Sequence, residues 1–186
     1  MSPIALFVLQ FLWFSAAWGV IVYYVIWPWS LSFDTNRRLA LWVAPEAFRV
    51  LGVGLLVPNL SPGMPMEFAI PTACADVTTA VLALSSFVAL QRSSRSARTL
   101  VWLCTIVGVS DLLIAFPHAA QVGAIGHLAA QWYVPVFAGP VMLIAHIACI
   151  ATLLRSRPGP PDGRPGADQR QSVSGLESPM SGSPSS

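Results

Sequence analysis

Five apolar segments, separated by short polar loops, constrain the fold of this chain more than any other feature. They cover approximately residues 4–27, 39–60, 68–90, 99–116 and 128–154. A helix needs roughly 17–25 such residues to cross about 30 Å of hydrocarbon. The chain is also 55% hydrophobic and only 10% charged, which is too apolar for a soluble domain of this length. We therefore expect an all-α transmembrane bundle of five spans within residues 1–157.

The distribution of arginine predicts how these spans are oriented. If all five segments cross, the arginines of the loops and of the stretch after the fifth span lie on one side: Arg37, Arg38, Arg92, Arg95, Arg98, Arg155 and Arg157. The second and fourth loops and the N-terminal end carry no basic residue. Basic loops stay in the cytoplasm, so we expect the N-terminus outside and the C-terminus inside. The second segment is the least apolar, but the charge bias would vanish if it did not cross.

The two ends of the chain differ in character. Residues 158–186 are rich in Pro, Gly and Ser and show no apolar period, so we expect a disordered cytoplasmic tail. The first segment lacks a basic region before it and a cleavage site after it, which argues against a removable signal peptide. The cysteines Cys74, Cys104 and Cys149 fall inside apolar segments, which predicts free thiols instead of a disulfide framework.

Ionisable side chains within the segments form the candidate site: Glu46, Arg49, Asp76, Asp111 and His146. A charge at the centre of a spanning helix costs about 2.5–3.5 kcal/mol on insertion scales, so such groups normally face a bundle interior or a wet cavity. Glu46 and Arg49 are three residues apart and can pair on one helix face. Arg49 and Asp76 lie at similar depths on neighbouring segments, which predicts a bridge between them. Asp111 is expected nearer the outer leaflet.

Asp76, Asp111 and His146 each share a face with small or polar residues on a different segment. Small residues let another helix approach closely. If the three faces converge, the bundle should enclose a polar cavity, with Asp76 and Asp111 in its outer half and His146 in its inner half. If each group is closed off by one neighbour, the groups only fasten the helices together.

The sequence contains none of the common motifs of phosphate-binding, hydrolytic or metal-binding enzymes. The chain has no Gly-rich phosphate loop, no His-Glu-x-x-His, no Gly-x-Ser-x-Gly and no Cys-x-x-Cys. The spacing His146-x-x-Cys149 could serve metal or haem ligation, but a lone buried histidine more often bonds a neighbour. We therefore expect no metal and no cofactor. Basic loops that face one leaflet suit anionic headgroups and give no sign of nucleic-acid binding.

The chain resembles uncharacterised small bacterial multi-pass integral membrane proteins over roughly residues 40–155. Three stretches carry the resemblance: Phe48-Arg49-Val50-Leu51-Gly52 with Val57-Pro58, then Ser110-Asp111-Leu112-Leu113 before Phe116, and Trp132-Tyr133-Val134-Pro135 followed by Pro140, His146 and Leu153-Leu154-Arg155. The resemblance implies a helical bundle in a bacterial cytoplasmic membrane and implies no activity.

Three classes of function follow as hypotheses. The first, which we favour, is a non-enzymatic membrane component whose polar groups fasten the bundle. The second is a proton-coupled or small-solute carrier that uses the five ionisable groups. The third is a membrane-embedded enzyme or cofactor-binding protein that uses His146 and Cys149. Expected partners are the lipid bilayer and a second copy or another membrane subunit, because five spans without an internal repeat are unusual for a transporter.

Overall fold

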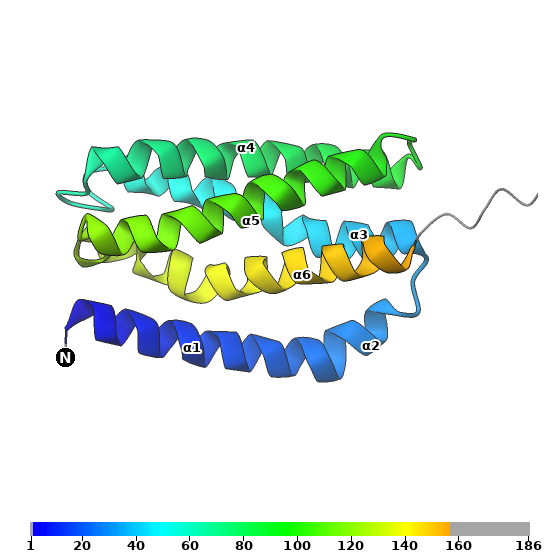
Figure 1. Cartoon of the computed structure of the whole chain (residues 1–186), viewed down its shortest axis with the longest axis horizontal. Helices are drawn as coiled ribbons and strands as arrows, with labels where there is room; N and C mark the ends of the chain where they lie inside the picture. Colours follow the sequence, from blue (N-terminus) through cyan, green and yellow to red (C-terminus); the bar gives the residue numbers. More distant parts are fainter. Residues whose placement is uncertain (1, 157–186) are drawn as a thin grey trace, which may run out of the picture. The chain divides into compact units, whose positions relative to one another are not determined.

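A computed structural model of the chain describes residues 2–156, all of them in helices, turns or connecting loops with no strand. Five helical stretches are long and apolar enough to cross a membrane: Pro3–Ser30, Thr35–Leu56, Met66–Gln91, Ala97–Gln121 and Ala129–Arg155 (Figure 1). This confirms the expected five apolar helices. The tail expected to be disordered, residues 158–186, lies outside the described part of the chain.

The first helical stretch lies at the edge of the bundle. It consists of α1 (Pro3–Ile21), one π-helical turn η1 (Val22–Ile26) and α2 (Trp27–Ser30). Phe7 is its only buried residue up to Ile21, and large apolar side chains such as Leu12 and Trp13 are exposed. Exposed apolar surface of this extent suits a helix whose solvent is lipid, because lipid tails are as apolar as leucine.

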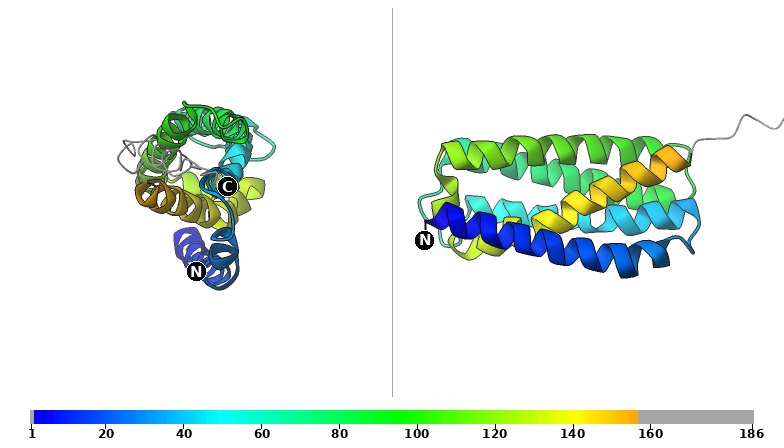
Figure 2. Two further views of the ribbon diagram at one scale, coloured as in Figure 1. Left: turned by 90° about the vertical axis from the view of Figure 1, so that its right-hand side faces the viewer. Right: turned by 60° about the horizontal axis from the view of Figure 1, so that its bottom comes forward.

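The other stretches pack around a common interior. They are α3 (Thr35–Val43) with η2 (Ala44–Leu56), α4 (Met66–Gln91), α5 (Ala97–Gln121) and α6 (Gly139–Arg155). Contacts join α3 and η2 to α4, α4 to α5, α5 to α6, and α6 back to α3. The view along the helices shows this ring, with α1 outside it (Figure 2). Helix α1 contacts α6 and the turn η5 before it.

The second stretch changes helix type halfway along. Helix α3 is capped by Asp34, whose carboxylate accepts a hydrogen bond of 2.8 Å from the backbone of Arg37. Beyond Val43 the chain continues as an unusually long 3₁₀-helix, η2, with Pro45 in its first turn. This stretch ends at Leu56 and not at residue 60 as expected. Val57 is extended because it precedes Pro58, which disfavours a helical conformation for the residue before it.

The fourth stretch, α5, runs to Gln121, beyond the expected end at Phe116. The helix continues through Pro117. A proline removes one N–H and crowds the preceding turn, but spanning helices tolerate this because neighbouring groups and local adjustments satisfy the freed carbonyl. The helix ends where Gly123 takes a left-handed conformation with φ of 70°, a common terminator that glycine adopts without strain.

The last stretch is irregular in its first half. It follows a short 3₁₀ turn η3 (Ala124–His127) and contains a second one, η4 (Ala129–Trp132), and a π-helical turn η5 (Val134–Ala138) before α6 begins. Pro135 lies in the first turn of η5 and Pro140 in the first turn of α6. These prolines interrupt the half of the stretch that lies farther from Arg155.

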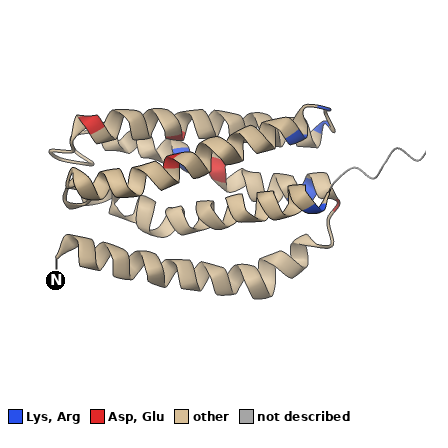
Figure 3. Ribbon diagram, viewed as in Figure 1, with Lys and Arg blue, Asp and Glu red and all other residues tan. Residues whose placement is uncertain are grey.

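Arginines gather at one end of the helical unit (Figure 3). Nη1 of Arg98 donates a hydrogen bond of 2.7 Å to the carbonyl oxygen of Ser156, and Arg155 lies 5.6 Å from the ring centre of Trp27. The first and third loops and the end of α6 therefore meet at this end. At the opposite end, the backbone N–H of Ala130, at the start of the last stretch, donates to the carbonyl oxygen of Leu60 in the second loop at 3.1 Å.

Two apolar clusters fill the interior. One lies toward the arginine-rich end and includes Leu39, Val43, Leu90, Val101 and Leu153. The other lies toward the opposite end and includes Phe7, Leu55, Phe68, Ile125 and Leu128. In each helical stretch that carries them, the ionisable residues of the interior lie between the residues of these two clusters, which places them near the middle of the bundle.

Candidate functional site

The 3₁₀-helix η2 presents one straight row of side chains to the interior. Its buried residues are Glu46, Arg49, Gly52 and Leu55, each three positions after the last. A 3₁₀-helix has three residues per turn, so side chains at this spacing lie directly above one another. In an α-helix, with 3.6 residues per turn, the row would rotate away from the interior. The helix type thus directs both Glu46 and Arg49 inward.

Arg49, Asp76 and Asp111 meet because they lie at equal depth. Asp76 is ten residues from the start of α4 at Met66, and Asp111 is ten residues from the end of α5 at Gln121; at 1.5 Å per residue both are ~15 Å from the same end. Arg49 is seven residues from Leu56, which at about 2.0 Å per residue in a 3₁₀-helix is ~14 Å. Asp111 is therefore at mid-depth and not near the outer leaflet, because α5 extends past Phe116.

Every nitrogen of the Arg49 guanidinium faces an acceptor on α4 or α5. Nε donates a hydrogen bond of 2.7 Å to Oδ1 of Asp76, Nη2 donates to Oδ2 of Asp111, and Nη1 donates to the carbonyl oxygen of Gly108 at 3.3 Å. The side chain of Arg49 is 2% exposed. A buried charge is tolerated when it is paired and its hydrogen bonds are made, and here two carboxylates on two helices satisfy one cation.

Two glycines make room for these contacts. A Cβ at Gly52 would lie 1.8 Å from Oδ2 of Asp76, and one at Gly108 would lie 2.3 Å from Nε2 of His146. Real side chains cannot approach so closely. Gly52 therefore admits the Asp76 carboxylate against η2, and Gly108 admits His146 against α5.

Glu46 and His146 form a second polar contact, one helical turn closer to the arginine-rich end of the bundle than Arg49. Oε2 of Glu46 lies 3.8 Å from Nη1 of Arg49 and 3.2 Å from Nε2 of His146, and both side chains are 1% exposed. Neither oxygen of Glu46 nor Nε2 of His146 makes an aligned hydrogen bond within the described residues. The pair is thus close but its hydrogen-bonding groups are not satisfied, which is rare for buried groups. The five ionisable residues form one connected group, which we call the Arg49 cluster.

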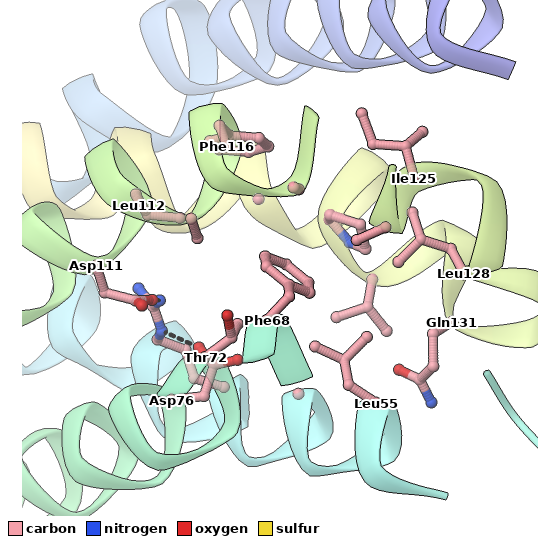
Figure 4. Close-up of a pocket in the computed structure, with 18 of the residues that line it drawn as sticks. Leu55, Phe68, Thr72, Asp76, Asp111, Leu112, Phe116, Ile125, Leu128 and Gln131 are labelled. Atoms are coloured by element: carbon pink, nitrogen blue, oxygen red, sulfur yellow. Dashed lines mark hydrogen bonds and ion pairs between the residues drawn. The ribbon is translucent and has the colours of Figure 1, made fainter. Parts of the chain in front are cut away.

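A cavity of about 100 Å³ adjoins one side of the Arg49 cluster. Asp76 and Asp111 lie at one end of it, Gln131 and Leu128 at the other, and Phe68 between them (Figure 4). Arg49, Thr72 and Gly52 also line it, and most of the remaining wall is apolar. The cavity lies on the side of the cluster toward the end without arginines, among the residues of the second apolar cluster.

Some of the ionisable side chains meet inside the bundle as the sequence predicted. The predicted bridge between Arg49 and Asp76 is present, whereas Glu46, the expected partner within the same helix, is the more distant acid. Asp111 joins the same guanidinium. The cavity beside Asp76 and Asp111 is mainly apolar and His146 does not line it, so it is not the polar cavity of the first alternative; Arg49 and Glu46 lie between Asp76 and His146.

Several residues of the site escaped the sequence reasoning. Gly52 and the carbonyl group of Gly108 contribute close packing and a hydrogen-bond acceptor, and Gln131 lines the cavity with a buried amide oxygen that lacks a hydrogen-bond partner. Gly52 lies three residues after Arg49 and therefore on the same helix face, which is a usable sequence signal for close packing at this position.

The thiols take no part in a recognisable metal site. Cys104 and Cys149 are buried and Cys74 is exposed, and all three are free. Sγ of Cys104 is 3.8 Å from the carbonyl oxygen of Thr79. Across residues 2–156, no three His, Cys, Asp or Glu side chains are grouped so that they could hold a metal ion.

Comparison with known proteins identifies the chain at the level of a family. A family model described as "Domain of unknown function (DUF8737)" matches residues 6–154, which reaches from the first helical stretch into the last one. No curated protein matches the chain, and no solved structure matches it.

Proposed function

We propose that this chain, which belongs to the family of the domain of unknown function DUF8737, is a non-enzymatic multi-pass protein of the bacterial cytoplasmic membrane that binds a small solute beside the Arg49 cluster and lets it cross the bilayer. Its N-terminus lies outside and its C-terminus in the cytoplasm. The observation that carries the proposal is the cavity that ends on Asp76 and Asp111. Ligand sites are typically apolar hollows with a few convergent polar groups, and this cavity has that composition.

The number of acids supports a role beyond packing. One carboxylate suffices to neutralise a buried arginine, yet the Arg49 cluster holds Glu46, Asp76 and Asp111. Buried ionisable groups in a membrane are costly and usually mark a functional path or site. Asp76 and Asp111 also retain 13% and 8% side-chain exposure, so both carboxylates can meet a molecule in the cavity.

A purely structural role is the second candidate. It is favoured by the closure of Asp76 and Asp111 onto the same guanidinium, which ties η2, α4 and α5 together. On this view the acids hold the helices in place and the cavity is a packing defect. The two candidates differ in what happens when the cavity is filled while the Arg49 cluster is left intact.

The test compares two aromatic substitutions on adjacent residues of α5. Ala115 lines the cavity, whereas Ile114 is 67% exposed and faces outward. Purified protein is reconstituted into liposomes, and entry of small cationic, neutral and anionic solutes is followed by light scattering as the vesicles swell. We expect entry of at least one solute to exceed that in empty liposomes, to fall in Ala115→Phe and to persist in Ile114→Phe.

Parallel stability measurements separate function from folding. Asp76→Asn and Asp111→Asn are assayed in the same liposomes, and each variant is first melted in detergent to confirm that it is folded. If a folded Ala115→Phe variant behaves like the unmodified protein, and no solute enters faster than in empty liposomes or stabilises the protein in detergent, the structural role is the correct one.

A further inference from the structure

We infer that the solute bound in this cavity is a small organic cation, such as a primary ammonium on a short apolar chain, with its N–H groups directed at Asp76 and Asp111. The inference rests on the proposed function, because it assigns a chemical class to the molecule that the cavity binds. It follows from the hydrogen-bonding groups that remain free, from the balance of charge and from the cavity walls.

The polar groups left free at the cavity are mostly acceptors. Arg49 is the one cationic donor on the cavity wall, and each of its three nitrogens already donates to Asp76, Asp111 or Gly108. Oδ2 of Asp76 and Oδ1 of Asp111 accept no hydrogen bond from a described residue. Oε1 of Gln131, at the other end, is buried and equally unpartnered. A ligand that donates hydrogen bonds would satisfy these oxygens. An anion would meet only neutral free donors, the hydroxyl of Thr72 and the amide nitrogen of Gln131, because the one cation on the wall is already paired with two carboxylates.

The charges around the cavity also favour a cation. Helix η2 contributes Glu46 and Arg49, α4 contributes Asp76, α5 contributes Asp111, and α6 contributes His146, which contacts Glu46. Three carboxyl groups therefore surround one permanently charged guanidinium. Both oxygens of Glu46 lack a hydrogen-bond donor although the residue is fully buried. A cation at the cavity end would oppose this excess of acidic groups at short range, where a low-dielectric interior strengthens the attraction.

The walls limit the rest of the molecule. Beyond the carboxylates the cavity is lined by side chains such as Phe68, Leu112, Phe116 and Leu128, which offer an apolar surface and aromatic faces but few hydrogen bonds. A volume of about 100 Å³ is smaller than the roughly 150 Å³ of an engineered apolar cavity that accepts benzene. A short alkyl chain on the ammonium group suits this space, whereas a bulky or highly hydroxylated cation does not.

The experiment uses three probes of nearly equal size that differ in charge: propylammonium, 1-propanol and propionate. Their binding to the purified full chain in detergent is measured by thermal stabilisation and by calorimetric titration. We expect propylammonium to bind more tightly than 1-propanol by at least about tenfold, because a charge-assisted hydrogen bond to a carboxylate is worth more than a neutral one. Propionate should not bind above background.

Variants locate the bound probe. Asp76→Asn should weaken propylammonium binding by about tenfold or more and leave 1-propanol binding nearly unchanged. Because Asp76→Asn could also unfold the protein by releasing Arg49, Ala115→Phe provides a second reading: it leaves the Arg49 cluster intact and should abolish binding of propylammonium. Ile114→Phe adds the same ring on the outward face and should bind as the unmodified protein does.

Each contrary outcome has a distinct meaning. If 1-propanol or propionate binds most tightly and Ala115→Phe abolishes that binding, the assignment of a cation is wrong and the solute-binding function stands. If no probe binds and no cationic, neutral or anionic solute enters the liposomes, both the assignment and the proposed function fail. If propylammonium binds equally well to folded Ala115→Phe, it binds elsewhere and the assignment to this cavity is overturned.

Discussion

Gly108 and His146 lie so close that a Cβ on the glycine would stand 2.3 Å from Nε2 of the histidine. The contact brings α5 against α6 at the depth of the Arg49 cluster, and it depends on the absence of a side chain. The carbonyl group of the same glycine accepts a hydrogen bond from Arg49. One small residue thus serves both the Glu46–His146 contact and the hydrogen bonds of the arginine.

Replacing this glycine should therefore destabilise the bundle. In Gly108→Ala the added methyl group must displace His146, and overpacking of this kind typically costs about 1–3 kcal/mol. Gly19→Ala is the matched control, because a Cβ at Gly19 would meet nothing within 4 Å. Thermal melting in detergent should show a lower midpoint for Gly108→Ala alone. Equal midpoints for the two variants would mean that the close approach of α5 and α6 does not exist in solution.

A double-mutant cycle on Arg49 tests whether the cluster is energetically coupled. Arg49→Leu should cost about 3–5 kcal/mol, because it leaves buried carboxylates without their cation. Combining it with Asp76→Asn or Asp111→Asn should cost less than the sum of the single changes, since residues in one hydrogen-bonded network are not additive. Unfolding free energies from denaturant titration provide the measurement. Strict additivity with both acids would show that the three side chains do not interact.

Arg37 and Arg38 offer a test of how the arginine-rich end is held together. Arg38 donates hydrogen bonds of 2.9, 3.1 and 3.0 Å to the carbonyl oxygens of Ser30, Leu31 and Phe33 at the end of α2, whereas Arg37 has only an exposed ion pair with Asp34. Arg38→Gln should lower stability by about 1 kcal/mol or more, because hydrogen bonds from a charged group at a helix C-terminus are lost.

Arg37→Gln serves as the control for that change, since it removes the same charge from the neighbouring position. We expect its effect on the thermal midpoint to be close to zero, as exposed ion pairs contribute little. A comparable loss in both variants would point to the loop charge itself, and not to the hydrogen bonds on α2, as the stabilising factor.

Reporter fusions decide the proposed orientation. A reporter joined after Leu154, at the arginine-rich end, should be active in the cytoplasm, whereas one inserted near Gly123, at the opposite end, should report the outside. The physical reason is the preference of basic loops for the cytoplasmic side. Fusions that report the same side would overturn the five-span topology, and reversed signals would overturn the orientation.

The candidate residues of the site were visible in the sequence, but most of their pairings were not. Arg49 and Asp76 could be matched because each was counted from the end of its own helix. The sequence places Asp111 too close to one leaflet because its depth is counted from Phe116, the expected end of the fourth segment, and prolines such as Pro117 can lie inside a spanning helix. The pairing of Asp111 with Arg49 became visible only when α5 was seen to reach Gln121.

Hydropathy and loop charge are properties of each segment alone, so the amino-acid sequence was enough to predict five apolar helices, a cluster of arginines at one end and ionisable residues within the helices. Apart from the pair Arg49 and Asp76, the contacts among these groups became visible in the folded bundle. It showed η2 as a 3₁₀-helix that aligns Glu46, Arg49 and Gly52 on the inner face, and it brought Asp111 and Gly108 of α5 to the same guanidinium. The type of helix sets the direction in which each side chain points, and the position of the helix ends sets its depth in the bundle. Both depend on packing against neighbouring helices, which the sequence of one segment does not reveal.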